Sequence, residues 1–419
     1  MQTPSTPPRP RLEIRRLAWA CAFALAGFQA QAHDLSQDPL PAAAGWRLGA
    51  AAAVTGIAAS GDSAWPATGW RGLPGSGRAP DGRRGLGLEH ATVDLAGAIV
   101  PSAGTRLGAV FAAGRHGSGQ VHAEAARIEA RTDLGLDRLA LQLGRDRVPL
   151  GPVLTSAGHV DRHAQVPAIK RVTLDGDWIA DGLNLRWQRG VTAGLQGLDL
   201  GLWRSRSWPG AASAGWTPAL HLEGGWDRWR ADLSYARLRP QGRGVPVTGA
   251  TAVHSHDTPD CRLGTVNLVC FDGRSELLGA SLSWDPHEQP WAVTLGGLLQ
   301  REQGHLASSL GQAEVRSRTR GGWLDLQWRL GEPWLAGLRL EHAQASHRLS
   351  GPGASRVATE AGLLPNTPVR RAAASLTWSA APDWRLGAEA GTESSSLPST
   401  RWIGLRAIWS RRDVAGLSW

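Results

Sequence analysis

The sequence predicts an all-β protein, a transmembrane antiparallel β-barrel of about 16 strands whose third long loop folds inward. Three observations lead to this fold class. Polar and apolar residues alternate with period two, tryptophans flank tight turns, and short connections alternate with long ones. Successive side chains of a strand point to opposite faces, so a period of two indicates strands with one apolar and one polar face.

The clearest example is the segment 321–344. In its first half Leu324, Leu326 and Trp328 alternate with polar residues, and the alternation resumes after a turn at 331–333. Two alternating runs that are joined by a tight turn predict a β-hairpin.

The same unit recurs, and each of four hairpins carries a tryptophan on both sides of its turn. The four pairs are Trp226 with Trp229, Trp284 with Trp291, Trp328 with Trp334, and Trp378 with Trp384. Tryptophan concentrates where the hydrocarbon of a bilayer meets the headgroups. We therefore expect these turns to lie just outside one face of a membrane. The alternative is a large soluble β-protein with tryptophans in its core.

The first 32 residues have the pattern of an export signal. Four arginines precede an apolar run at 17–28, and Ala30 and Ala32 fit a cleavage site. We expect residues 1–32 to be a signal peptide and residues 33–419 to form a single barrel domain. No later apolar run reaches the roughly 18 residues of a membrane helix, and only helices and closed barrels satisfy the backbone in lipid. These features predict the outer membrane of a Gram-negative bacterium.

The remaining strands follow in order along the chain. Before the tryptophan hairpins we expect strands at 46–58, 86–100, 105–115, 121–132, 139–147, 183–189 and 198–206. Long loops are expected at 60–85, 148–180, 207–215, 240–274, 302–317 and 346–369. The final segment, 401–419, is long for one strand and short for two, so 14 or 18 strands are alternatives. The terminal Trp419 resembles the C-terminal aromatic signal that the barrel-assembly machinery reads.

The positive charge of the chain comes almost entirely from arginine. The formal net charge is +9, and Lys170 is the only lysine. An arginine-rich lumen favours anions. High genomic GC content also exchanges lysine for arginine, although it does not explain the positive balance. The chain shows no basic run and no recognition helix, so nucleic-acid binding is not expected.

The third long loop, 148–180, carries a family resemblance. The segment LGRDRVPLG leads into it and DWIADGLNLRW returns to the barrel wall. Over 139–188 this pattern resembles the O/P-type, phosphate-selective group of outer-membrane porins, in which a Gly-x-x-x-x-Pro-x-Gly segment ends the strand before the pore loop. The resemblance implies a channel that this loop constricts. The multi-lysine phosphate pathway of that group is not evident in a chain with one lysine.

Charged residues of this loop are the candidates for the constriction, because charges over a narrow gap focus the electric field. The candidates are Asp161, Arg162, His163, Lys170, Arg171, Asp175 and Asp177. We expect the cations to face the aspartates; the alternative is that several are solvated charges on the loop surface. Arg186, Arg230 and Arg329 fall on the polar faces of their strands and are predicted to line the lumen.

Cys261 and Cys270 are the cysteines that remain after removal of the signal, and an oxidising compartment predicts a disulfide between them. Just before them, His254 and His256 lie on one side of an extended segment and form a weak candidate for a Zn²⁺ or Cu²⁺ site. We otherwise expect no metal site and no cofactor.

Together these features predict a porin that gives passive diffusion of small hydrophilic solutes, with a preference for anions. The expected partners are outer-membrane lipids, lipopolysaccharide and small solutes, and the assembly is a homotrimer or a monomer. The alternative is a plugged barrel that binds ligands at the surface through loop 240–274. No Gly-x-Ser-x-Gly elbow stands between a strand and a helix, so we do not expect an enzyme.

Overall fold

The computed structural model describes most of the chain from Leu40 onward. The described residues are 40–61, 84–116, 121–150, 155–157, 160–191, 193–204, 206–211, 215–247, 258–264, 266–286, 288–363, 368–395 and 399–418. The predicted signal peptide, the histidines at 254 and 256 and the terminal Trp419 lie outside these ranges.

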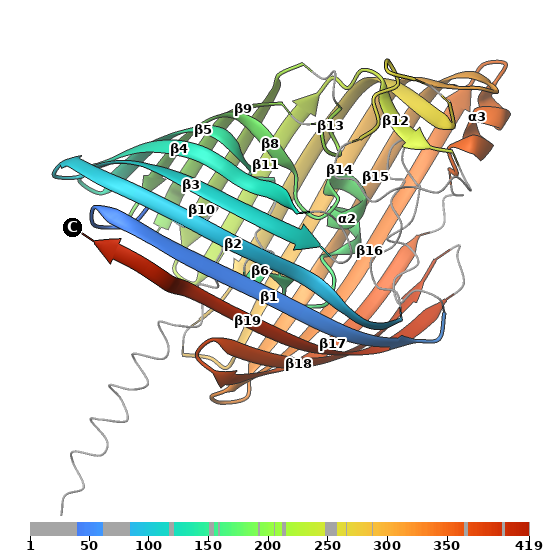
Figure 1. Ribbon diagram of the computed structural model, residues 1–419. Coiled ribbons are helices and arrows are strands. Elements are labelled where there is room, and N and C mark those ends of the chain that lie inside the picture. The colour runs from blue at the N-terminus through green and yellow to red at the C-terminus, as the bar shows by residue number, and fades with distance from the viewer. Residues whose placement is uncertain are drawn as a thin grey trace, which may run out of the picture.

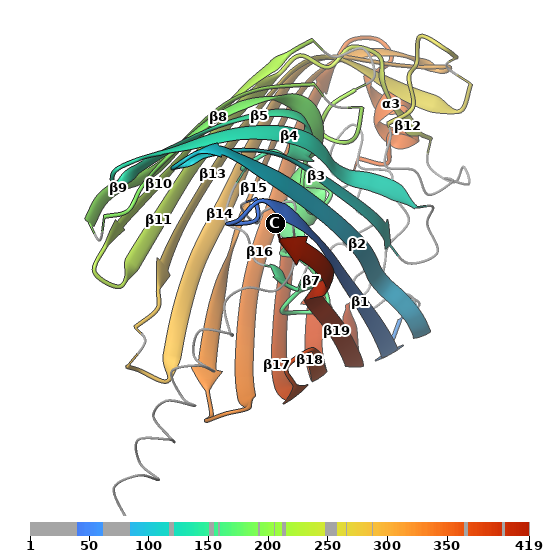
Figure 2. The same ribbon diagram turned by 60° about the vertical axis from the view of Figure 1, so that its left-hand side comes forward.

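Sixteen antiparallel strands close into a barrel, in which β19 pairs with β1 (Figure 1, Figure 2). The first eight are β1 (Gly45–Ala59), β2 (Gly85–Ser102), β3 (Thr105–His116), β4 (His122–Leu134), β5 (Asp137–Arg147), β8 (Ile179–Arg189), β9 (Ala193–Arg204) and β10 (Thr217–Trp226). The others are β11 (Trp229–Leu238), β13 (Leu268–Trp284), β14 (Trp291–Ser308), β15 (Gly311–Arg329), β16 (Trp334–Ser350), β17 (Val369–Ala381), β18 (Trp384–Ser394) and β19 (Thr400–Ser418). The predicted fold class is confirmed, and the segment after Arg401 is one strand.

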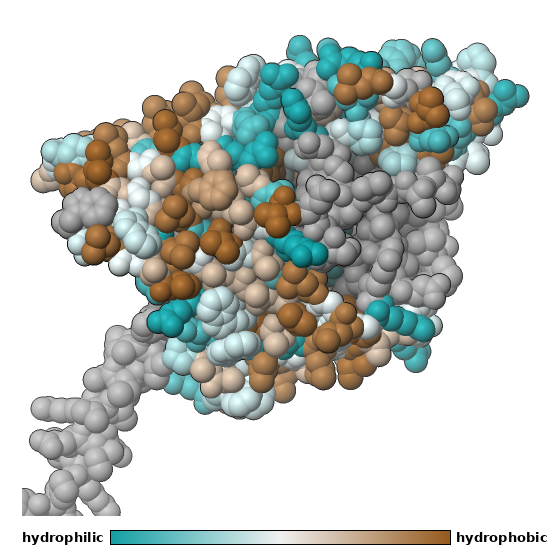
Figure 3. Space-filling view, in the orientation of Figure 1, coloured by the Kyte–Doolittle hydropathy of each residue, from teal (hydrophilic) through white to brown (hydrophobic). Residues whose placement is uncertain are grey.

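The outer face of the barrel is apolar and the inner face is polar. On β2, for example, Val93 and Leu95 are exposed, whereas Thr92 and Asp94 between and beside them are buried inside. Figure 3 shows apolar side chains spread over the outer surface in the view of Figure 1. This alternation is the one that a lipid-facing barrel requires. Among the described residues, no helix has the length and apolarity needed to cross a membrane.

A belt of tryptophans runs from β10 to β19 along the end of the barrel that carries the tight turns. Trp226 stacks on Trp229 with ring centroids 5.8 Å apart, and Trp284 lies 4.1 Å from Trp291. The belt continues through the cross-strand pairs Trp291 with Trp328, Trp334 with Trp378, and Trp384 with Trp409. The four predicted hairpins are confirmed, and the belt is the feature expected at a membrane interface.

At the opposite end, β13 to β16 are 17 to 19 residues long. A strand needs about 9 to 11 residues to span the bilayer, so these four extend well beyond it. The predicted loop 302–317 is therefore wrong: β14 continues to Ser308, and a turn of two residues leads into β15. Much of the predicted loop 346–369 is also ordered, because β16 reaches Ser350 and the short helix α3 (Ala354–Glu360) follows.

The connection between β5 and β8 is the third long loop, and it folds inward as predicted. It contains β6 (Thr155–Ala157), β7 (Val160–Asp161) and the helix α2 (Ala168–Leu174), which lies against β14, β15 and β16 inside the barrel (Figure 1, Figure 2). Ile169 and Leu174 pack in one apolar cluster with Trp323 of the wall. Gly296 leaves the space for this tryptophan, since a Cβ there would lie 2.2 Å from Trp323 Cζ2.

Candidate functional site in the barrel lumen

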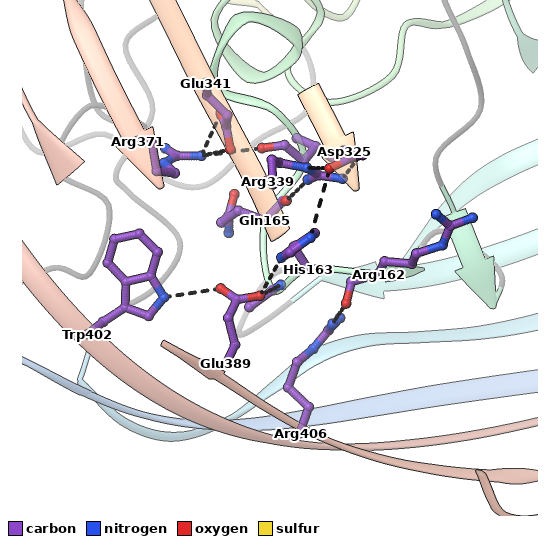
Figure 4. A network of polar contacts seen from close by, with 12 residues as sticks. Arg162, His163, Gln165, Asp325, Arg339, Glu341, Arg371, Glu389, Trp402 and Arg406 are labelled. Carbon is purple, nitrogen blue, oxygen red and sulfur yellow. Dashed lines mark hydrogen bonds and ion pairs between the residues drawn. The ribbon is translucent and has the colours of Figure 1, made fainter. Parts of the chain in front are cut away.

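Three arginines of the wall hold the third loop in place (Figure 4). They come from three different strands, β16, β17 and β19, and each donates to a backbone carbonyl of the loop. The pairs are Arg339 Nη1 with Gln165 O at 2.8 Å, Arg371 Nη1 with Val166 O at 3.5 Å, and Arg406 Nη1 with Arg162 O at 2.8 Å. Loop carbonyls that turn away from water thus find charged donors on the wall.

Two glutamates of the same wall accept hydrogen bonds from loop N–H groups. Glu389 Oε2 accepts from Ala164 N at 2.8 Å, and Glu341 Oε2 accepts from Ala168 N at 2.6 Å. Ala168 is the first residue of α2, whose initial N–H groups have no partner within the helix. The wall therefore caps the loop helix with a carboxylate.

Each of the three arginines also has a carboxylate partner. Arg339 Nε lies 2.6 Å from Asp325, Arg371 Nη2 lies 2.7 Å from Glu393, and Arg406 Nη2 lies 2.6 Å from Glu89. The side chains of the three arginines are at most 4 % exposed. We call these three arginines, together with Asp325, Glu341, Glu389, Glu393 and Glu89, the loop-anchor network.

His163 joins the loop to this network from the loop side. Its Nδ1 lies 3.3 Å from Glu389 Oε2, and its Nε2 lies 3.9 Å from Asp325 Oδ1. Glu389 is held further by Trp402, whose Nε1 donates to it at 3.1 Å. His163 is thus a buried anchor between two carboxylates, and not a side chain that projects into open lumen.

Most of the other predicted constriction charges pair with one another inside the loop. Lys170 Nζ lies 3.0 Å from Asp177 Oδ1, and Arg171 Nη1 lies 3.5 Å from Asp175 Oδ1. Lys170 is buried in the helix. The side chain of Asp161 is outside the described residues. These pairs neutralise charge locally, and the assignment of the constriction stays a prediction.

Arg162 differs from these residues because its side chain is exposed. It lines small cavities together with Ser375, Thr377 and Arg406. Arg385 of β18 lies near enough for the two positive charges to repel each other. The loop thus brings positive charge to the inner surface of β17 to β19.

The three arginines that were predicted to line the lumen have different surroundings. Arg186 Nε lies 2.6 Å from Asp199 on the neighbouring strand. Arg230 is exposed and shares the inner face of β11 with Asp232. Arg329 is bound to the turn at the belt end, where it pairs with Asp285 and donates to Gln289 O at 3.0 Å.

Sequence reasoning missed a cluster on β10 and β11, formed by His221, Glu223 and Asp232. One ligand atom from each residue lies within 4.8 Å of the other two. The His-x-Glu spacing at 221–223 was visible in the sequence and places both side chains on one face of a strand. The third member depends on how β11 pairs with β10, which the spacing alone does not supply.

The disulfide between Cys261 and Cys270 is present, with an S–S distance of 2.01 Å. Cys270 belongs to β13, so the predicted loop 240–274 ends earlier, at residue 267. This loop also contains β12 (Arg243–Pro246), where Arg243 is fully buried between the rings of Trp208 and Phe271 and pairs with Glu302 at 2.6 Å. In the same loop, a hydrogen bond from Arg262 lowers the pKa of the Asp260 carboxyl.

No protein-family model matches this sequence, and no curated protein matches it. Several solved structures are similar. OmpT of Vibrio cholerae, in a trimer form, gives a TM-score of 0.57 at 8% identity, covering 88% of this chain and 100% of that one. The anion-selective porin of Comamonas acidovorans gives a TM-score of 0.52 at 12% identity, covering 87% of this chain and 99% of that one. The channel DcaP of Acinetobacter baumannii gives a TM-score of 0.53 at 10% identity, covering 88% of this chain and 96% of that one.

At these identities the likeness shows the fold. A closed barrel with an apolar outer face, a tryptophan belt and a polar interior is an outer-membrane β-barrel, and the chain resides in the bacterial outer membrane. Its general architecture is that of porins and related channels, with the third loop turned into the lumen.

Proposed function

We propose that the protein is a porin that lets small hydrophilic solutes diffuse passively across the outer membrane, with a preference for anions. The observation that carries the proposal is the third loop, which the loop-anchor network fixes against the wall. A loop that only filled space would not need five hydrogen bonds between its backbone and buried charged side chains, three donated by arginines and two accepted by glutamates. Fixing the loop at one wall keeps the rest of the cross-section available to solutes.

The anion preference rests on Arg162 and Arg385. The loop-anchor arginines are neutralised by their carboxylates, and Lys170 and Arg171 are neutralised by aspartates of the loop. Arg162 is exposed and lies close to the half-buried Arg385, so this part of the lumen presents positive charge to the solute. Like charges at a narrow, low-dielectric passage raise the local concentration of the opposite ion.

Single-channel recording of the purified barrel in potassium chloride, with a reversal potential under a salt gradient, tests this function. We expect open steps and an anion-selective reversal potential. Arg162→Gln should shift that potential toward zero, because it removes one exposed charge. Arg171→Gln is the matched control, since Arg171 is paired within the loop and should change the potential much less. The absence of current at every voltage would overturn the proposed porin function.

The second candidate is a plugged barrel that binds ligands at the cell surface. The observation in its favour is the ordered structure in the extracellular half of the lumen. Trp208 donates from Nε1 to Thr173 O of the third loop at 3.0 Å, and it also covers the buried Arg243. The same recording separates the two candidates, because a plugged barrel passes no current.

We further propose lipopolysaccharide as the lipid partner of the long strands. Above the apolar band their outer face is basic, and two arginine pairs lie directly opposite each other across strands: Arg301 with Arg318, and Arg316 with Arg348. All four side chains are exposed. Like charges at paired positions destabilise a sheet unless an anion lies between them. Phosphate analysis of the purified barrel should show lipopolysaccharide that is lost when these four are replaced by glutamine.

The remaining predictions concern processing and assembly. We propose that residues 1–32 are removed, which N-terminal sequencing of the mature protein would show as a chain beginning at His33. We propose a homotrimer, as in the trimer form of OmpT, and insertion through recognition of Trp419 by the barrel-assembly machinery. Chemical crosslinking in native membranes tests the homotrimer. Deletion of Trp419, followed by measurement of the amount of inserted barrel, tests its recognition by the barrel-assembly machinery.

A further inference from the structure

The pairing of three neighbouring strands brings four polar side chains together on the inner face of the barrel. His221 of β10 lies directly opposite Asp199 of β9, and Glu223 of β10 lies directly opposite Asp232 of β11. Side chains at opposed positions have Cβ atoms about 4.5 to 5.5 Å apart. The register of β9, β10 and β11 therefore assembles one histidine and three carboxylates without any contribution from a loop.

The imidazole of His221 lies between two of these carboxylates. Its Nδ1 lies 3.1 Å from Asp199 Oδ2, and its Nε2 lies 3.3 Å from Asp232 Oδ1. Ligand atoms around a tetrahedral Zn²⁺, with bonds of about 2.1 Å, are separated by about 3.4 Å. The distance between Nε2 and the Asp232 oxygen, and the grouping of the Glu223 carboxylate within 4.8 Å of both, suit an ion placed among the three.

The groups around the cluster fix the orientation of these ligands. Asp199 Oδ1 accepts from Arg186 Nε at 2.6 Å and from Asn184 Nδ2 at 2.9 Å, so its other oxygen is positioned to receive the Nδ1–H of His221. That hydrogen bond leaves Nε2 with a lone pair that points at Asp232. A carboxylate behind a ligating histidine is the usual way in which proteins set the tautomer and ring orientation at a metal.

Asp232 is held in the same manner. Its Oδ2 accepts from Ser281 Oγ of β13 at 2.7 Å, while Oδ1 faces the histidine. Glu223 is exposed to the lumen, and its carboxylate lies over Gly197, where a Cβ would come 2.7 Å from Glu223 Oε2. Two ligands are thus positioned and the third is reachable from the solution that fills the barrel.

The net negative charge of the cluster favours a bound cation. With the imidazole neutral, the three carboxylates Asp199, Glu223 and Asp232 outweigh Arg186 by two negative charges among these residues (three minus one). A divalent ion compensates this excess, and its borderline softness matches a set of one nitrogen and two oxygens. Without the ion, the imidazole takes a second proton and remains hydrogen-bonded to Asp199 and Asp232, which is the alternative that the experiment must separate.

We propose that the inner wall binds a Zn²⁺ ion through His221 Nε2, Asp232 Oδ1 and the Glu223 carboxylate, with a remaining coordination position that is open to the lumen. This site lies on β10 and β11, on other strands than the loop-anchor network, which belongs to β15 to β19 and β2. Its occupancy would add positive charge to this part of the wall, so zinc would raise the anion preference of the channel or slow its current. The binding itself does not depend on the porin function.

The test is calorimetric titration of Zn²⁺ into the folded, chelator-stripped full barrel in detergent, with metal analysis after dialysis. We expect one zinc per chain. His221→Gln and Glu223→Gln should each weaken binding by at least 100-fold, and Asp199→Asn should weaken it by about 10- to 100-fold because it only orients the histidine. His342→Gln, an exposed histidine on the outer face of β16, is the control and should bind like the parent protein.

Two results would overturn the site: a parent protein that retains no zinc, or a His221→Gln variant that binds as tightly as the parent. Glu223→Gln guards against a folding artefact, since Glu223 is exposed and its replacement leaves the barrel intact. Co²⁺ provides a second readout, because a tetrahedral set of one nitrogen and oxygens gives strong visible absorption. A Co²⁺ spectrum identical to that of the ion in buffer would also count against the proposal.

Discussion

Two groups of charges lie on different strands of the inner wall, and they have opposite roles. In the loop-anchor network every arginine has both a carboxylate and a loop carbonyl as partners, and the network is almost completely buried. In the cluster on β9 to β11, carboxylates outnumber cations and Glu223 is exposed. A saturated, buried network holds structure together, whereas an unsaturated cluster that reaches solvent is able to bind a ligand.

The two groups also differ in how they are assembled. The loop-anchor contacts join residues far apart in sequence, such as Ala164 and Glu389, which are separated by 225 positions. The cluster is formed by adjacent strands, with His221 and Asp232 only 11 positions apart. Loss of one anchor should therefore disturb the whole lumen, while loss of one cluster residue should have a local effect.

The largest effect is expected for Arg371→Met. The substitution leaves Glu393 and Glu341 buried without their cation, and breaking a buried pair in this way costs about 3–5 kcal/mol. Urea unfolding of the barrel in detergent measures the loss of stability, and single-channel recording should show larger or noisier steps as the loop detaches. Arg370→Met is the matched control, because Arg370 is exposed at the neighbouring position. Equal stability of the two variants would show that the network is not structural.

A smaller effect is expected when Cys261 and Cys270 are both replaced by serine. The disulfide closes a loop with a sequence separation of 9, for which the chain-entropy model gives about 2.5–3 kcal/mol. Because Cys270 lies near the start of β13 and Ser281, which contacts the cluster, lies near its end, zinc affinity should stay unchanged while the unfolding midpoint falls. The parent protein with its disulfide reduced should behave like the double variant, which separates the bond from the serine side chains.

The alternation of residues within single strands predicted the barrel. The sites in the lumen depend on how the strands pair with one another, which this alternation does not specify. The hairpin around 331–333 is visible because lipid-facing Leu326 and Trp328 alternate with polar residues. The alternation of apolar and polar residues did not reveal the strands within 302–317, because the outer face of β15 above the bilayer carries Arg316 and Arg318 in place of apolar residues. The extended strand then looks polar on both faces and reads as a loop.

The predicted site residues illustrate the same limit. The sequence marked Lys170 and Asp177 as facing charges of the pore loop, and they pair, but the partner of His163 is Glu389 of β18, which only the tertiary fold brings close. His221 was not singled out, because its companions Asp199 and Asp232 stand on the flanking strands. A register shift of one residue in either strand would turn those carboxylates to the lipid face.

The smallest effect is expected for Gly197→Ala, which tests how finely the cluster is built. A Cβ at this position would lie 2.7 Å from Glu223 Oε2 and 3.2 Å from Glu223 Cβ, so the glutamate must shift. Because Glu223 is exposed and free to move toward the lumen, the free energy of unfolding should change by less than about 0.5 kcal/mol. Zinc affinity should nevertheless fall several-fold, since the shift moves one of three ligands.

Gly224→Ala is the control for this substitution. It lies on the adjacent strand with the ordinary contact of 3.5 Å to Gly194 O, and it should leave zinc affinity unchanged. If Gly197→Ala destabilises the barrel as strongly as an anchor variant does, the cluster is packed like the loop-anchor network and the contrast between the two groups fails. If Gly197→Ala lowers zinc affinity without lowering stability, the space beside Glu223 is needed for metal binding and not for folding.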